Sequence, residues 1–522
     1  MIRKRKLPPM RGRSTAMTIA APTLGWNARD ALADMNPQDA VFLENLFPSP
    51  SSVQARLGYT VWASGITGIV ETIFQYSGGA TEKMFAAAGT QIYDVTTQGG
   101  VGAASVTGLT NGRWQYVNNT TSGGSYMQMV NGADKMRVFD GTNWHTDGDG
   151  VPYDVTGVDT ATCIGITLSH NRVWFVQNST LKAWYLPTGA IGGAANALDL
   201  SSFAERGGYL MAVATWTMDA GYGMDDMTVF ITSEGEVIVY RGSDPSSATT
   251  WALVGVFLIG SPIGRRCAIK FAGDLLLITQ DGVISMAAAL QSSRVNPKAA
   301  LSNKIQYAIS SAISTYGANY GWQLLQFPRE NMLILNVPIQ EGLNQQQYVM
   351  STIKRGTGDW AWCNFTGWPA SCWELWEDDI YFGCTNAVYK AWNGYDDNGG
   401  NIAARGLQAF NNFGNDQAQK RFTMMRPILQ TDGAPSVLAQ MNVDFDLSDT
   451  TSPLSFSPVT YATWDNALWD AGIWAGAVSV LKNWQGCTGI GYWAAPQLKT
   501  ATMGIQTFWV NTTVVFESGG II

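Results

Sequence analysis

A hairpin that recurs at nearly constant spacing is the feature that most constrains the fold of this chain. Each copy has an apolar strand, a polar or glycine-containing turn, and a second strand that ends near a large side chain. These large residues are separated by 46, 46, 55, 46 and 103 positions; they are Tyr93, Phe139, Tyr185, Tyr240, Met286 and Tyr389. One small sheet cannot bury both of its faces, so repeats of about 40 to 50 residues favour sheets that stack radially as a β-propeller.

The hairpins set the number of expected repeats. They lie at residues 83–95, 126–141, 172–186, 228–242, 274–287 and 379–394, and a less regular unit at 331–356 fills the long gap. We therefore expect six or seven repeats. A string of ordinary hairpins in β-sandwiches is the alternative, because no repeat carries the His and Trp-Asp signature of WD40 propellers.

Changes of pattern along the chain predict four segments. Residues 1–23 form a basic arm, 24–64 a connecting segment that packs on a platform or a neighbouring subunit, 65–400 the propeller, and 401–522 a second, β-rich platform domain. The expected fold class is all-β with few short helices. The two helices that the apolar spacing predicts lie around 37–46 and 296–314.

The composition agrees with a β-rich protein that contacts other chains. The 522 residues include 56 Gly, 21 Trp and 19 Tyr, and only 14% are charged. Ordinary soluble domains have about 25% charged residues. This balance is typical of strands, tight turns and large shared surfaces.

The charge is distributed unevenly. The first thirteen residues carry six basic and no acidic side chains, which leaves 26 basic against 40 acidic residues, or −14, for the remainder. An acidic body repels nucleic acid, whereas the arm could bind an acidic protein partner or contact DNA phosphates directly. The candidate contact residues of the arm are Arg3, Lys4, Arg5, Lys6, Arg11 and Arg13.

Cysteine usage and hydropathy bear on where the protein is made. The six cysteines include no CxxC pair, and residues 14–24 are too often interrupted by polar residues and proline to form a signal core. We expect free, mostly buried thiols in a protein made in a reducing cytosol. The longest compact apolar run, residues 251–260, is too short to span a bilayer, so no membrane insertion by a helix is expected.

Motifs that carry chemistry are scarce. The two histidines, His145 and His170, are expected in turns or packing rather than as bases or ligands. The Asp-Gly segments 146–150 and 395–400 lack the spacing and distal glutamate of a calcium loop, so turns are the preferred interpretation. A phosphate-binding GxxxxGK[ST] motif and a GxSxG elbow are both missing from the sequence. We expect a protein that is not an enzyme, with no cofactor and no metal.

One acidic stretch keeps a glycan-cleaving alternative open. Some propellers hydrolyse sugars with paired carboxylates, and tryptophans can stack on a sugar ring. Residues 371–383 contain both kinds of side chain: Glu374, Glu377, Asp378, Asp379, Trp373 and Trp376. The competing interpretation is a charged hairpin edge with core tryptophans.

Three stretches of the chain, near its two ends, resemble a phage protein family. "LGWNARDALADMNPQDAVFLENLFPSPSSVQARLGY" (24–59) resembles the N-terminal signature of tail nozzle proteins of short-tailed bacteriophages, also known as tail tubular protein B or packaged-DNA stabilisation-like proteins. In that signature a "LENLFP" block is followed by an arginine-glycine-tyrosine lead into the first propeller strand. The similarity continues in "MMRPILQTDGAPSVLAQMNVDF" (424–445) and in the Trp-Asp loop at 461–475.

The resemblance implies a structural role in the virion. It implies a homohexameric ring below the portal and its adaptor ring, with double-stranded DNA leaving through a central channel, packaged DNA retained, and tail fibre or spike proteins as further partners. The expected location is the phage tail, after synthesis in the host cytoplasm. The acidic body and the missing catalytic motifs agree with this expectation.

Aromatic and apolar residues near both ends are candidate anchors. Phe42, Leu46 and Phe47 are expected to hold the connecting segment on the platform or on a neighbouring subunit. Trp464, Trp469 and Trp474 recur every five residues, which fits neither a helix face nor a strand face, so they are expected to pin an irregular loop. The competing function is a virion-associated glycan-binding or glycan-cleaving propeller, which predicts convergent carboxylates at the propeller axis.

Overall fold

The computed structural model divides the chain into two compact units. The propeller unit comprises Tyr59–Thr352 and Thr366–Asn393, and the terminal unit comprises the remainder, namely Met1–Gly58, Ile353–Phe365 and Gly394–Ile522. The structure describes residues 14–519 except 80–81, 220–223, 248, 290–296, 355–358, 450–453, 455 and 457–478. Among these described residues, no helix is both long and apolar enough to cross a bilayer.

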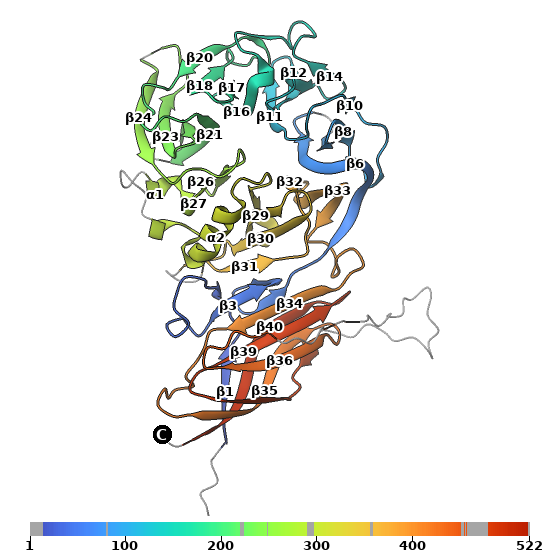
Figure 1. Cartoon of the computed structure of the whole chain (residues 1–522). Helices are drawn as coiled ribbons and strands as arrows, with labels where there is room; N and C mark the ends of the chain where they lie inside the picture. The colour runs from blue at the N-terminus through green and yellow to red at the C-terminus, as the bar shows by residue number, and fades with distance from the viewer. Residues whose placement is uncertain are drawn as a thin grey trace, which may run out of the picture. The chain divides into compact units, whose positions relative to one another are not determined.

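The propeller unit is a β-propeller with seven blades among its described residues, and the blades follow the chain around an axis (Figure 1). The first blade contains the second half of β6 (Tyr59–Tyr76), then β7 (Lys83–Ala88), β8 (Gln91–Asp94) and β10 (Val106–Thr107). The second contains β11 (Gln115–Thr121), β12 (Gly124–Val130), β13 (Arg137–Phe139) and β14 (Trp144–Thr146). The third contains β16 (Cys163–Ser169), β17 (Arg172–Gln177), β18 (Lys182–Tyr185) and β20 (Asn196–Asp199).

The remaining blades are less uniform. The fourth contains β21 (Leu210–Asp219), β22 (Met224–Thr232), β23 (Glu236–Gly242) and β24 (Trp251–Leu258). The fifth contains β25 (Ala268–Phe271), β26 (Asp274–Thr279) and β27 (Gly282–Ser285), and the sixth contains β28 (Gln323–Phe327), β29 (Met332–Gln340) and β30 (Asn344–Ser351). The seventh contains β32 (Cys372–Trp376), β33 (Asp379–Ala391), the first half of β6 and β9 (Gly99–Gly100).

Strand β6 closes the propeller by belonging to two blades. Residues 59–69 of β6 pair with β33, and residues 70–76 pair with β7. Within the first half, Gly65 and Gly68 adopt φ values of +87° and +100° between the paired residues Ser64 and Ile69, a conformation that glycine reaches without steric cost. The last and first blades therefore share one continuous strand.

Short elements fill the remaining connections. Strands β15 (Val155–Thr156) and β19 (Gly193–Ala194) form a small parallel pair. The described helices are short: α1 (Met286–Ala289), α2 (Gln306–Tyr316), and the 3-10 turns η1 (Thr160–Thr162), η2 (Pro297–Ala299), η3 (Asn303–Ile305) and η4 (Pro328–Glu330). The helix expected over 296–314 is thus two 3-10 turns followed by α2.

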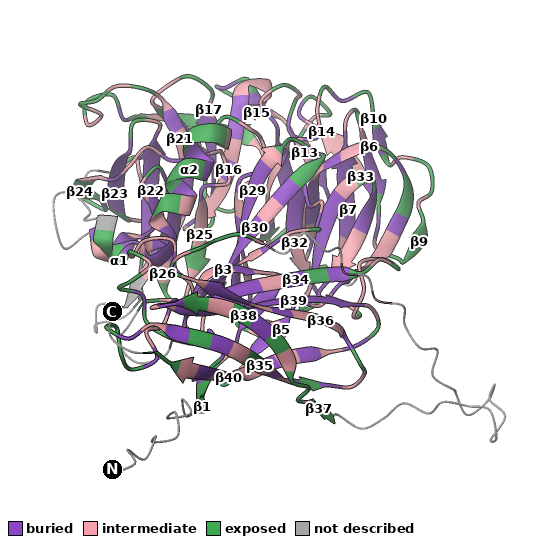
Figure 2. Cartoon of the chain, turned by 60° about the horizontal axis from the view of Figure 1, so that its bottom comes forward, coloured by how far each residue is buried: buried purple, intermediate pink, exposed green. Residues whose placement is uncertain are grey.

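The recurring aromatic residues pack between blades. Tyr185 and Trp174 of the third blade share a buried cluster with Tyr240 and Trp251 of the fourth, and the rings of Trp174 and Trp251 stack at 5.7 Å. Phe139 of the second blade joins a comparable cluster with residues of the first. Strands β7, β17 and β23 are accordingly mostly buried (Figure 2). The sequence spacing was therefore a true signal of blade stacking.

The described strands of the terminal unit lie in two sheets, to which both ends of the chain contribute (Figure 1). One sheet contains β1 (Ser14–Ala20), β4 (Leu46–Pro48), β5 (Val53–Ala55), β35 (Lys420–Thr431), β37 (Ser479–Leu481), β38 (Gln485–Gly491) and β40 (Thr507–Ser518). The other contains β2 (Gly25–Trp26), β3 (Asp39–Glu44), β31 (Trp362–Phe365), β34 (Ile402–Gln408), β36 (Ser436–Val443) and β39 (Ala494–Thr502). A Cβ on Gly406 of β34 would lie 3.3 Å from the Trp509 ring of β40, so the two sheets pack closely.

Two local predictions were wrong. The helix expected at 37–46 is strand β3, because its main chain pairs with β34 on one side and β31 on the other. The hairpin expected at 379–394 is the single strand β33, and its turn lies earlier, where Glu377 and Asp378 have φ values of 48° and 61°. In both places tertiary pairing overrode a local pattern.

The compact units also differ from the expected division. Residues 24–58 do not merely connect two domains; they supply β2 to β5 of the terminal unit. Residues 353–365 lie within the expected propeller but belong to the terminal unit, to which they contribute β31.

Candidate functional site

The propeller axis encloses a cavity of about 320 Å³. Its lining comes from the innermost strand of each of the seven blades: Thr72 and Ile73 of β6, Gln115 and Tyr116 of β11, Gly165 to Thr167 of β16, Met211 to Thr215 of β21, Ala268 to Lys270 of β25, Gln323 and Leu324 of β28, and Trp373 and Glu374 of β32. A cavity at this place follows from the radial packing of blades. Its volume is within the range of small-molecule sites.

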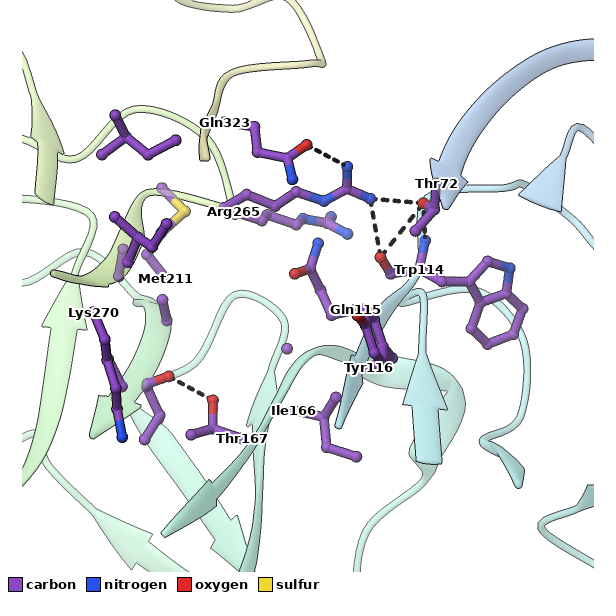
Figure 3. A pocket seen from close by; sticks show the side chains of 18 of the residues that line it. Thr72, Trp114, Gln115, Tyr116, Ile166, Thr167, Met211, Arg265, Lys270 and Gln323 are labelled. Atoms are coloured by element: carbon purple, nitrogen blue, oxygen red, sulfur yellow. Dashed lines mark hydrogen bonds between the residues drawn. The ribbon is translucent and has the colours of Figure 1, made fainter. Parts of the chain in front are cut away.

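Two arginines enter the cavity from the segment that precedes β25. Gly264 has a φ of +73°, which turns the chain, and the fully buried Cys267 fixes the other end of the Arg265–Arg266 pair. Figure 3 shows Arg265, Gln115 and Tyr116 pointing into the same space, whereas the indole of Trp114 points away.

Arg266 is held by neutral oxygen atoms. Its Nη2 donates to the Thr72 hydroxyl at 2.6 Å and to the Trp114 carbonyl at 3.1 Å, and its Nη1 donates to Gln323 Oε1 at 3.3 Å (Figure 3). The guanidinium also lies 5.5 Å from the centre of the Tyr320 ring. These contacts fix Arg266 as part of the cavity wall.

The guanidinium of Arg265 makes far fewer hydrogen bonds than that of Arg266. Among the described residues its one hydrogen bond runs from Nη1 to the Asn131 carbonyl at 3.4 Å, and it forms no ion pair. Burial lowers the pKa of Arg265, and the nearby Arg113 lowers it further. The side chain also borders a second pocket, of about 600 Å³, next to Arg113 and Tyr320. An arginine has five N–H donors, so this guanidinium retains most of its binding capacity.

Glu374 is the one carboxylic acid among the described lining residues of the axial cavity. Burial raises its pKa to about 7, although hydrogen bonds from Tyr116 and from the Leu375 amide and the charge of Arg266 act in the opposite direction. The Glu374 side chain is half-buried and lines the cavity. Near neutral pH the group changes between a neutral donor and an anion.

The acidic stretch around Glu374 does not converge on one point. Glu377 and Asp378 form the exposed turn between β32 and β33, whereas Asp379 is engaged in ion pairs with Arg329 and Lys390. These two cations lower the pKa of Asp379, against an opposing effect of burial. Trp373 and Trp376 are both buried.

The other chemically suggestive residues have structural contacts. His145 lies 3.1 Å from Asp140 and stacks on Tyr153 at 3.8 Å, and His170 lies in a turn 3.0 Å from the Ser169 hydroxyl. The described residues contain no group of three or more His, Cys, Asp or Glu side chains suited to a metal. All six cysteines are free, and only Cys384 is not fully buried.

The predicted anchors are partly described. Leu46 and Phe47 are buried inside the terminal unit, where Phe47 lies 6.5 Å from the ring of Phe365. The half-buried Phe42 ring lies under the Arg405 guanidinium at 5.1 Å. Two predicted sets lie outside the described residues: Arg3, Lys4, Arg5, Lys6, Arg11 and Arg13, and Trp464, Trp469 and Trp474.

The "LENLFP" and "ARLGY" blocks meet in a buried polar cluster of the terminal unit. Arg56 is 1% exposed and binds Asp397 through two hydrogen bonds of 2.7 and 2.6 Å. Its Nε donates to Asn45 Oδ1 at 2.9 Å, and Asn45 has a φ of 55°, a conformation that asparagine tolerates better than most residues. A Cβ on Gly58 would lie 1.6 Å from the Asp396 carbonyl, so only glycine fits there.

This cluster also explains the segment 395–400, which superficially resembles a calcium loop. Asp397 serves Arg56, and Asp396 accepts a hydrogen bond from the Gly399 amide at 2.6 Å. Burial raises the pKa of Asp397 more than Arg56 lowers it. The carboxylates therefore have a structural role.

Sequence reasoning missed the arginines at the propeller axis. A usable signal was present: "GRRC" places two adjacent arginines between apolar segments in a chain that is poor in charge. Such a pair is costly to bury unless it meets partners or a ligand.

Comparisons with known proteins add little. No family model and no curated protein matches the chain. Among solved structures, the BBS1N chain of a complex with ARL6DN is 8% identical, with a TM-score of 0.38 over 66% of this chain and 99% of that one. YCF48 from Cyanidioschyzon merolae is 11% identical, with a TM-score of 0.35 over 64% and 99%, and YCF48 bound to D1 peptide is 10% identical, with a TM-score of 0.35 over 67% and 98%. Scores this low carry no argument about this chain.

Proposed function

We propose that this chain is a structural subunit of a short-tailed phage tail, the nozzle that retains packaged DNA and conducts it during ejection. The observation that carries the proposal is the position, in the folded chain, of the residues that resemble the nozzle family. The stretches 24–59 and 424–445, far apart in the sequence, contribute strands to the same unit, and Asn45, Arg56 and Gly58 form one cluster there. Residues that act together in folding are the kind that a family signature preserves.

The competing glycan-cleaving function has less support. Hydrolysis by the usual route needs two carboxyl groups about 5 to 10 Å apart across the scissile bond. The axial cavity offers Glu374 alone among its described lining residues, and Asp379 is engaged by two cations. The structural role is therefore the better-supported proposal.

The decisive experiment is imaging of the purified protein by negative-stain electron microscopy, alone and with the adaptor ring. Sixfold rings with a channel wider than a DNA duplex are the expected result. Monomers in both samples, together with cleavage of bacterial surface glycans, would contradict the proposal and favour the enzyme.

The structure changes which residues should be tested for subunit contact. Leu46 and Phe47 are interior residues of one unit, so replacing them is expected to destabilise that unit rather than release intact monomers. Exposed apolar side chains on β37, β38 and their connection are better candidates: Val480 is 56% exposed, Trp484 42% and Ile490 60%. Large exposed apolar residues on edge strands are typical of interaction surfaces, and in a homohexamer the partner is a second copy.

The matching test compares Ile490→Asp with Thr188→Asp, a change at an exposed position in a propeller loop. Mass photometry should show monomers for Ile490→Asp and unchanged rings for Thr188→Asp. Rings of both variants would exclude this edge as the subunit contact.

A further inference from the structure

The axial cavity combines a positive charge excess with unused hydrogen-bond donors. Among the described lining residues, the cationic side chains are Arg265, Arg266 and Lys270, and Glu374 supplies the one carboxyl group. Lys270 is exposed, so the lining reaches solvent at that residue. A concave site with net positive charge and several convergent polar groups favours a small anionic ligand.

Several hydrogen-bond donors in the cavity have few or no acceptors among the described residues of the protein. Arg265 has one long hydrogen bond among the described residues, and the buried Nε2 of Gln115 has none. Both side chains point into the same space (Figure 3). Unsatisfied buried donors are rare in folded proteins, because each one costs free energy unless water or a ligand meets it.

The neighbouring groups limit the charge of the ligand. Arg266 is already bound by Thr72, Gln323 and the Trp114 carbonyl, so only one guanidinium fork remains free. One fork matches the two oxygens of one carboxylate. The Thr215 hydroxyl and the Gln115 amide would suit a ligand that also carries hydroxyls, and the Thr167 hydroxyl, which already donates to the Val213 carbonyl at 2.6 Å, can accept a further hydrogen bond.

We propose that the axial cavity binds an acidic monosaccharide, with its carboxylate on Arg265 and its hydroxyls near Gln115, Thr167 and Thr215. The inference is independent of the nozzle function, because it concerns the propeller axis rather than the assembly of a ring. No covalent step is involved. The site is a binding site for a free or chain-terminal sugar acid.

Glu374 should make this binding depend on pH. Its carboxyl faces Tyr116 of β11 and Arg266, and Arg265 and Lys270 line the same cavity. Since burial raises the pKa of Glu374 to about 7, the group is largely neutral below that pH and anionic above it. An anionic Glu374 repels the ligand carboxylate, so affinity should fall as pH rises through about 7.

The primary test is isothermal titration calorimetry of the full chain with glucuronate, glucose and inorganic phosphate. Glucuronate should bind saturably, with glucose and phosphate at least about tenfold weaker. Arg265→Gln should weaken glucuronate binding at least about tenfold. Arg206→Gln is the matched control, because the exposed Arg206 also donates one 3.4 Å hydrogen bond to a carbonyl oxygen but does not line the cavity. It should leave binding unchanged.

A second variant keeps the proposal testable if Arg265→Gln fails to fold. Glu374→Gln retains a side chain that can hydrogen-bond to Tyr116 and should abolish the loss of affinity between about pH 6 and about pH 8. No saturable binding of glucuronate, tighter binding of phosphate, or equal binding by the Arg265→Gln and Arg206→Gln variants would each overturn the proposal. Ring formation in the microscope would be unaffected by any of these results.

Discussion

Two arginines in different units of the molecule show how the partners of a charge indicate its role. Arg56 of the terminal unit is almost completely buried, with two hydrogen bonds to Asp397, one to Asn45 and one to the Leu57 carbonyl. Arg265 of the propeller unit is half-buried beside a cavity, with one hydrogen bond at 3.4 Å. A buried guanidinium whose donors all have protein partners stabilises one arrangement of the chain. A guanidinium beside a cavity whose donors lack protein partners can instead bind a ligand.

The largest expected effect on stability comes from removing Arg56 from its pair with Asp397. Arg56→Ala leaves Asp397 buried without its partner and should reduce the free energy of unfolding of the terminal unit by about 3 to 5 kcal/mol. Denaturant unfolding monitored by tryptophan fluorescence measures this loss. The control Arg206→Ala should change stability by less than about 0.5 kcal/mol. A loss below about 1 kcal/mol for Arg56→Ala would mean that the cluster is not structural.

The next effect concerns the closure of the propeller unit. A Cβ on Gly383 of β33 would lie 2.6 Å from Val70 Cγ1 and 2.7 Å from Cys372 Sγ, so Gly383→Val overpacks the blade in which the two ends of the propeller meet. We expect a loss of about 1 to 3 kcal/mol in thermal or chemical unfolding. Gly100→Val is the matched control, because a Cβ there meets no atom within 4 Å. Equal stability of the two variants would contradict a tightly packed closing blade.

A smaller effect is expected from the carboxyl group at the propeller axis. Between its ordinary pKa of 4.5 and the raised value of about 7, Glu374 holds a proton in the folded protein but not in the unfolded chain. Stability that depends on this proton is present at low pH and is lost as pH rises through that window. Glu374→Gln should therefore be more stable than the wild type by about 1 to 3 kcal/mol near pH 8, towards the lower end because the group faces a cavity.

The same pair of proteins provides the check on this prediction. Near pH 4.5 the difference in the free energy of unfolding between wild type and Glu374→Gln should approach zero. A constant difference from about pH 4.5 to about pH 8 would show that Glu374 does not titrate in this window.

The smallest effect completes the comparison of the two arginines. Arg265→Gln removes one long hydrogen bond and a desolvated charge, so the free energy of unfolding should change by less than about 1 kcal/mol. Unfolding measured beside Arg56→Ala gives the contrast directly. A loss as large as that of Arg56→Ala would mean that Arg265 is a structural residue.

Much of the blade structure could be predicted from the sequence, because the strands of a hairpin are neighbours along the chain. The pairs β7–β8, β12–β13, β17–β18, β22–β23 and β26–β27 lie where alternating apolar residues and turns predicted them. The Tyr185 and Tyr240 positions also marked the packing between blades correctly. The expected all-β class with few short helices is confirmed.

The wrong or missing predictions concern contacts between residues that are far apart in the sequence. Residues 39–44 resemble a helix by local spacing but form β3, since β31 and β34 supply hydrogen-bond partners on both sides. The Glu374 carboxyl was considered for chemistry, yet its neighbours Tyr116 and Arg266 could not be foreseen. No local pattern specifies which blades face each other across an axis.

The sequence by itself determined the repeating hairpins, the shortage of charge and the glycine-rich turns, because these depend on residues close together in the chain. Only the tertiary structure decided how the propeller closes, with β6 shared between blades, and which partner Arg56 meets 341 residues away. It also decided that seven inner strands enclose a cavity with Arg265 in its wall. Such contacts require distant segments to pack together, and packing depends on the shape and polarity of the whole unit rather than on local preference.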